Sequence, residues 1–196
     1  MNNPSLFDLQ EHLPSSETVD EINQELLEKG KALFPDRFFI FGTGKIDTKV
    51  VIVGESPGAP DADSEKPFMG PVGDLLVKIL ASIGLRREEV YLTNVVKFIS
   101  AGDELTPEIL KFFTPFLVRE ILAINPKLII SLGNTPTRAL LNTKKSITQI
   151  RGEFYDFHGI KLIPTFNPAY LLRDASKKRE VWEDMKMVRA FLAEIN

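Results

Sequence analysis

Residues 49–58 read KVVIVGESPG, a run of β-branched apolar residues that stops at a loop of glycine and proline. A continuous apolar run of this length is typical of a strand buried on both faces of a parallel sheet. Similar runs follow at residues 90–96 and 127–132, and segments with helical spacing lie between them. The alternation predicts an α/β fold, with a parallel sheet and helices on both faces.

On either side of these strands, capping residues and apolar spacing predict the remaining helices and strands. Residues 153–157 and 161–164 flank His158-Gly159 and indicate a hairpin, while residues 55–70 are expected to be a loop. The expected helices span residues 16–33, 74–83, 106–124, 135–141 and 176–195, with a helical turn from Asn167-Pro168.

Composition limits the class of protein. With 196 residues, 43% apolar and 26% charged, the chain is expected to form one globular domain over residues 1–196, of which residues 1–35 are an arm and a helix. Apolar runs are too short to span a membrane, and the N-terminus has no signal-peptide pattern, so we expect a cytoplasmic monomer. The absence of cysteine excludes disulfides and thiolate ligands, and two histidines exclude a histidine-rich metal site.

The formal net charge of −3 is unevenly distributed. Residues 1–47 carry 9 acidic and 4 basic side chains, whereas the other 149 residues carry 18 acidic and 20 basic ones. A local basic surface is therefore compatible with the composition. A protein surface that is basic throughout and binds a nucleic acid along its whole extent is not.

Ligand sites of such sheets lie beyond the carboxyl ends of the strands, where the first loop carries Glu55 and Asp61. This loop lacks both the dinucleotide-binding fingerprint and the lysine of a phosphate-binding loop. Carboxylates suit the activation of water or the stabilisation of a developing cation. The alternative is a solvated acidic loop.

Three further residues are expected at the same edge of the sheet. Phe68, between Pro67 and Gly70, suits a stacking wall for a flat ligand, or else a core position under the loop. Asn94 ends a strand and can offer a donor and an acceptor to a base edge, or else cap backbone groups. Asn167 precedes a helical turn that can meet a DNA phosphate, or else is a plain N-cap.

Together these segments resemble the uracil-DNA glycosylase superfamily, and most closely its family 4. The resemblance runs from about Phe39 to Trp182 and rests on five motifs in order: GESPG with a following Asp, KPFMGPVGDLL, TNVVK, PKLIISLGNTPTRALL, and RG with LIPTFNPAYLLR. It implies a three-layer α/β/α sandwich with a central, mainly parallel four-stranded sheet. It also implies hydrolysis of the N-glycosidic bond of a uracil, or a related deaminated base, that is flipped out of DNA.

The resemblance also assigns roles to residues. Glu55 and Asp61 are its acidic residues, either of which can position water, and Asn167 stands at the group that stabilises the transition state. Phe68 stacks on uracil and Asn94 reads its amide edge, and the rest of the expected uracil pocket is Gly54, Ser56, Pro57 and Gly58. The expected DNA contacts are Pro168, Ala169, Tyr170, Leu171, Arg173 and Lys177.

Two positions depart from family 4. Its members carry a four-cysteine iron–sulfur cluster, but Phe98 and Phe113 occupy two of the corresponding positions and this chain has no cysteine. We therefore expect no cofactor and expect these apolar rings to fill its place. Family 4 usually has histidine where this chain has Asn167. This difference and the missing cluster leave open a DNA or damaged-base binding protein with little or no activity. The negative net charge and the short basic patch leave open an enzyme that acts on a free nucleoside or nucleotide.

Overall fold

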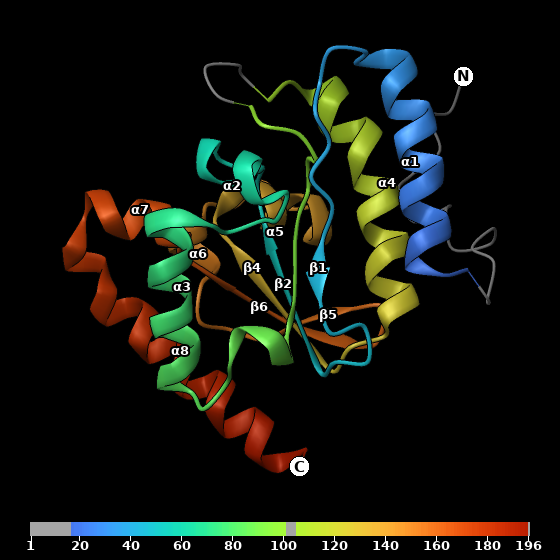
Figure 1. Ribbon diagram of the computed structural model, residues 1–196. Helices are drawn as coiled ribbons and strands as arrows, with labels where there is room; N and C mark the ends of the chain where they lie inside the picture. The colour runs from blue at the N-terminus through green and yellow to red at the C-terminus, as the bar shows by residue number, and fades with distance from the viewer. Residues whose placement is uncertain (1–16, 101–104, 196) are drawn as a thin grey trace.

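The computed structural model describes residues 17–100 and 105–195, so the expected arm and His12 lie outside the described residues. A mixed sheet of six strands in the order β1-β3-β2-β4-β6-β5 lies at the centre of the described chain (Figure 1). The strands are β1 (Thr43–Gly44), β2 (Val50–Gly54), β3 (Tyr91–Asn94), β4 (Leu128–Leu132), β5 (Tyr155–Phe157) and β6 (Ile160–Thr165).

The inner four strands are parallel, as expected, but the expected four-stranded sheet is extended to six strands by the antiparallel edge strands β1 and β5. Strand β2 pairs with β3 on one side and with β4 on the other, and β4 pairs with β6. Every residue of β2, β3 and β4 is buried, which explains their continuous apolar character. The hairpin of β5 and β6 is confirmed, and β5 is one antiparallel edge.

The opposite edge, β1, was not expected, because its two residues read as a turn. Gly44 has a φ of +130°, and a Cβ on it would lie 2.1 Å from the carbonyl oxygen of Val90. Only glycine allows the chain to pass so close to β3, and a two-residue strand carries no periodic pattern.

Helices cover both faces of the sheet and complete the three layers (Figure 1). One face carries α1 (Val19–Leu33), α4 (Pro107–Ile124) and α5 (Asn134–Leu141). The other carries α3 (Gly70–Ser82), α7 (Pro168–Arg173) and α8 (Lys178–Glu194). Two short helices, α2 (Ala59–Ser64) and α6 (Ile147–Ile150), were not expected from the sequence.

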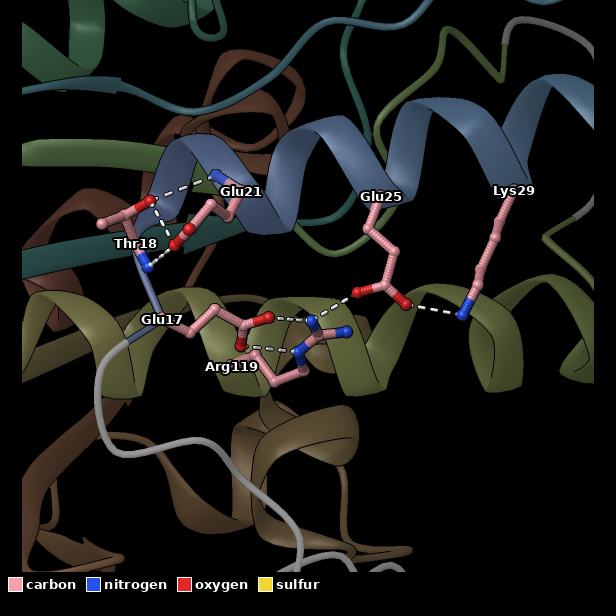
Figure 2. Close-up of polar contacts among 6 residues, drawn as sticks. All are labelled: Glu17, Thr18, Glu21, Glu25, Lys29 and Arg119. Carbon is pink, nitrogen blue, oxygen red and sulfur yellow. Dashed lines mark hydrogen bonds and ion pairs between the residues drawn. The ribbon is translucent and has the colours of Figure 1, made fainter.

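Polar contacts join α1 to α4 at the surface (Figure 2). Arg119 of α4 donates to the carboxylate of Glu17, just before α1, and to that of Glu25 within α1. Thr18 caps α1 through a reciprocal bond with Glu21. These contacts fix the start of α1 against the long helix.

A cluster of phenylalanines joins the same two helices at their other end. Phe98 and Phe113 are 1% and 0% exposed, and their ring centroids lie 5.4 Å apart in an edge-to-face arrangement. Phe34 follows α1 and stacks 5.9 Å from Phe113. We call this cluster the aromatic box, and its members are Phe34, Phe39, Phe98, Phe112 and Phe113.

Candidate active site

The sequence-predicted residues gather at the carboxyl ends of the parallel strands. Gly54, Asn94 and Thr165 end β2, β3 and β6, and helices α2, α5 and α7 begin just beyond this edge. Two cavities open here, of about 130 Å³ and about 500 Å³, and Asn167 and Ala169 line both. The two cavities are therefore neighbouring parts of one site.

The smaller cavity is bounded by a ring and by amide groups. Phe68, Asn94, Asn167 and Asp61 line it, together with Ser56 and Gly58. A Cβ on Gly54 would lie 2.3 Å from Asn94 Oδ1 and 2.6 Å from Phe68 Cζ. Glycine at the end of β2 therefore lets the ring and the amide approach each other. Pro57, expected in the same pocket, is buried.

Phe68 is held in an unusual backbone conformation, with a φ of +60° that non-glycine residues rarely adopt. The Asp61 carboxylate accepts from the backbone N–H of Met69 at 2.7 Å, of Gly58 at 3.0 Å and of Phe68 at 3.3 Å. The same contacts explain α2, because the bond from Gly58 N–H caps that helix. Asp61 therefore shapes residues 55–70, which we call the site loop, around the ring.

Arg87 holds Phe68 from the other side and was missed by the sequence analysis. Its guanidinium donates to the carbonyl oxygens of Pro67 at 2.6 Å and Phe68 at 2.8 Å. Burial lowers the pKa of Arg87, and the nearby charge of Asp61 opposes that effect. Arg87 lies in the short 3-10 turn before β3, where no local pattern marks it as part of the site.

The larger cavity contains the other carboxylate. Glu55 is exposed, lines this cavity and accepts a hydrogen bond from the Thr135 hydroxyl. Thr135 lies in the first turn of α5, directly after β4, so the loops after two neighbouring strands meet at this carboxylate. Thr135 was not predicted from the sequence either, although its position directly after a buried strand was a usable signal.

Asn167 connects the two cavities. Its Oδ1 caps α7 by accepting from Ala169 N–H at 2.9 Å, and its Nδ2 lies 3.5 Å from the Leu132 carbonyl oxygen. The plain N-cap role is therefore present. Because an amide nitrogen carries two hydrogens, Asn167 can also donate to a ligand in the cavities.

The segment expected to contact DNA divides into two groups. Ala169, Tyr170 and Arg173 line the larger cavity, and the Tyr170 ring lies 5.4 Å from that of Phe166. Pro168 and Leu171 are instead buried. The structure corrects the expectation for Leu171, because its side chain is 2% exposed and belongs to the core between α3 and α8.

Lys177, at the end of the same segment, is partly buried and forms an ion pair with Glu180 at 2.7 Å. Arg173 lines the larger cavity, and Lys177 is not among the residues that line it. His158 lies in the β5–β6 turn, at the opposite edge of the sheet from the site.

The iron–sulfur cluster implied by the resemblance does not fit the residues present. Phe98 and Phe113, at two of its expected positions, contact each other within the aromatic box. The chain has no cysteine to supply thiolates. Within residues 17–100 and 105–195, no group of three or more His, Asp or Glu side chains is placed to hold a metal ion.

The described helices include none that is both long enough and apolar enough to span a bilayer.

Comparison with known proteins agrees with this geometry. Residues 41–186 match the model of the Uracil DNA glycosylase superfamily. The chain is 41% identical over 158 residues to a type-4 uracil-DNA glycosylase of Thermotoga maritima, covering 78% of this chain and 82% of that protein. It is 32% identical over 183 residues to the type-4 uracil-DNA glycosylase of Archaeoglobus fulgidus, covering 88% and 92%. The chain therefore belongs to the uracil-DNA glycosylase superfamily.

Proposed function

We propose that this protein is a DNA glycosylase, which hydrolyses the N-glycosidic bond between uracil and deoxyribose in DNA. The observation that carries the proposal is the small cavity in which the Phe68 ring and the Asn94 and Asn167 amides converge. That cavity adjoins a larger one containing an exposed carboxylate, Glu55. The relatives named uracil-DNA glycosylases support the same function.

The small cavity suits a base removed from the stack. Extrusion costs a few kcal/mol, and stacking on an aromatic ring returns about 1–3 kcal/mol per base. The Asn94 amide can donate to a uracil carbonyl and accept from its N3–H, a pattern that cytosine does not present. Phe68 therefore contributes affinity, while Asn94 contributes the choice of base.

The chemistry follows from how charge develops. As the glycosidic bond breaks, the sugar gains positive charge and the uracil gains negative charge. Asn167 Nδ2 donates to the departing uracil oxygen, and the Glu55 carboxylate orients water and stabilises the sugar cation. The water oxygen bonds to the sugar carbon, its proton passes to solvent or to the carboxylate, and uracil leaves with the bonding electron pair.

Glu55 is assigned this role in preference to Asp61. Three backbone N–H groups already donate to the Asp61 carboxylate, whereas Glu55 is exposed and has a hydroxyl partner, Thr135. Asp61 accordingly acts by shaping the site loop. Both carboxylates are needed, but for different reasons.

The larger cavity suits the sugar and phosphates around the extruded nucleotide. Arg173 provides a positive charge at its wall, which Ser146 and Thr148 also line. The DNA contacts proposed here are therefore Ala169, Tyr170 and Arg173. A role in base excision repair follows from the reaction, while a single domain, a monomeric state and a cytoplasmic location stay predictions.

The test uses the purified protein with oligonucleotides that contain uracil, hypoxanthine or a mismatched thymine. We expect release of free uracil and one alkali-labile abasic site for each uracil. Uracil-dependent binding without base release over hours would replace the proposal with a non-catalytic binding protein. Turnover of a free nucleoside but of no oligonucleotide would also contradict it.

A further inference from the structure

A buried ion pair contacts the backbone of Asn94, which lines the small cavity, and no role assigned above uses this pair. Lys97 and Glu120 are each 1% exposed, and Lys97 Nζ lies 2.6 Å from Glu120 Oε2. Glu120 belongs to α4, so this pair links the middle layer of the fold to the helix that also carries the aromatic box. Lys97 follows β3 and lies three residues after Asn94.

The ammonium of Lys97 uses all three of its N–H bonds. Besides Glu120, it donates to Thr93 Oγ1 at 2.5 Å and to the backbone carbonyl oxygen of Asn94 at 2.9 Å. Tyr91 donates to the other oxygen of Glu120 at 2.9 Å, and burial together with Glu120 raises the pKa of Tyr91 well above its ordinary value. All three Lys97 N–H bonds therefore have acceptors, and one of these acceptors is the backbone carbonyl oxygen of Asn94, the residue proposed to recognise uracil.

The same turn also holds the backbone of the neighbouring site residues. Val95 N–H donates to the Gly54 carbonyl oxygen at 2.9 Å, and Val96 N–H donates to that of Glu55 at 3.0 Å. Residues 94–97 thus connect the Asn94 amide to the backbone of Gly54 and of Glu55. The buried Lys97 ammonium donates to the Asn94 carbonyl oxygen and so joins the two ends of this turn.

Stability alone explains such a pair poorly. Two charges lose their hydration on burial, and replacing a buried pair by uncharged side chains of similar size is often neutral or stabilising. We propose that Lys97, held by Glu120, is a positioning residue that fixes Asn94 and the Glu55 backbone for recognition of uracil. This inference rests on the proposed function and deepens it.

The test removes both charges together, because Lys97→Met alone would leave Glu120 buried and unpaired. The double variant Lys97→Met/Glu120→Gln keeps the side-chain lengths and leaves an amide for Tyr91 and Thr93. Phe113→Leu, on the same helix, is the matched control. For each protein we would measure the Tm, the inhibition constant for free uracil, kcat and KM, and hydrogen exchange at Val95 and Val96.

We expect the double variant to keep a Tm near that of the wild type. Its inhibition constant for uracil and its KM should rise, with kcat/KM lower by about 10- to 100-fold, because small misplacements of a binding group have effects of this size. Exchange at Val95 and Val96 should be faster, while that at Ile129 and Ile130 in β4 should not change. Phe113→Leu should lower the Tm and leave the inhibition constant as it is.

A folded double variant with an unchanged inhibition constant would overturn the inference, whatever its exchange rates. If the double variant does not fold, Glu120→Asp with the same readouts decides, because it keeps both charges, moves the carboxylate by one methylene, and should show the same changes to a smaller degree. If the wild type releases no uracil, the proposed function fails instead. The exchange rates then decide the positioning role, and unchanged exchange at Val95 and Val96 overturns it.

Discussion

The aromatic box and the site loop hold their phenylalanine rings in different ways. The box is a set of phenylalanine rings packed against one another, with Phe98 and Phe113 at most 1% exposed. The site loop contains a single ring, Phe68, whose backbone N–H donates to Asp61 and whose carbonyl oxygen accepts from Arg87, at a positive φ. The box gains stability from burial, whereas hydrogen bonds hold the loop in a backbone conformation that non-glycine residues rarely adopt. Changes in the two regions should therefore affect different measurements.

The largest effect is expected on the reaction, from Glu55→Gln. The substitution keeps the shape and the acceptor for Thr135 but removes the charge, so we expect the uracil release rate to fall by about 10²- to 10⁴-fold. Stability should stay within about 0.5 kcal/mol, because the side chain is exposed. Single-turnover release and urea unfolding measure the two quantities. If Glu55→Gln is destabilised but releases uracil at the normal rate per folded molecule, the proposed difference between the two regions is contradicted.

The corresponding change in the box is Phe113→Ala. Phe113 has no exposed surface and touches several other rings, so its truncation should lower the free energy of unfolding by about 3–5 kcal/mol. The rate per folded molecule should remain that of the wild type. Urea denaturation gives the first quantity, and single-turnover assays at a temperature where the variant is folded give the second.

A smaller effect is expected from Arg87→Met, which removes both donors to the carbonyls of Pro67 and Phe68. Release of the strained backbone should lower kcat/KM by about tenfold, since a catalytic geometry tolerates little displacement. The matched control is Arg86→Met, because Arg86 is exposed and pairs with Glu88 and Glu89 at the surface. Equal kcat/KM values for the two variants would show that Arg87 does not position the ring.

The smallest effect concerns pH and the surface contact between α1 and α4 (Figure 2). Hydrogen bonds from Arg119, and then from Lys29, lower the pKa of Glu25 below its ordinary value of 4.5. The folded state then favours the charged carboxylate, so this stabilisation is complete above pH 4.5 and is lost as the pH falls through the lowered pKa. Because the pair is near the surface, the loss should be at most about 1 kcal/mol.

Urea unfolding of the wild type and of Glu25→Gln, from pH 7 down to pH 3, measures this contribution. The difference between them should shrink as the pH falls. A constant difference across the range would contradict the assignment to Glu25.

The sequence predicted the central sheet because three strands are buried on both faces and read as unbroken apolar runs. It also brought Glu55, Phe68, Asn94 and Asn167 to one edge, since the loops after parallel strands share that edge. It could not predict the contacts of Arg87 or Thr135, which depend on the tertiary approach of distant segments. Leu171 shows the same limit, because a six-residue helix does not reveal from its pattern which side is buried.

The most direct test is one single-turnover assay of uracil release from duplex DNA, run on the wild type, Glu55→Gln and Phe113→Leu at equal concentrations of folded protein. We predict that Phe113→Leu releases uracil at the wild-type rate, while Glu55→Gln is slower by about 10²-fold or more. If Glu55→Gln matches the wild type, or if both variants slow down equally, the separation of chemistry from stability is contradicted.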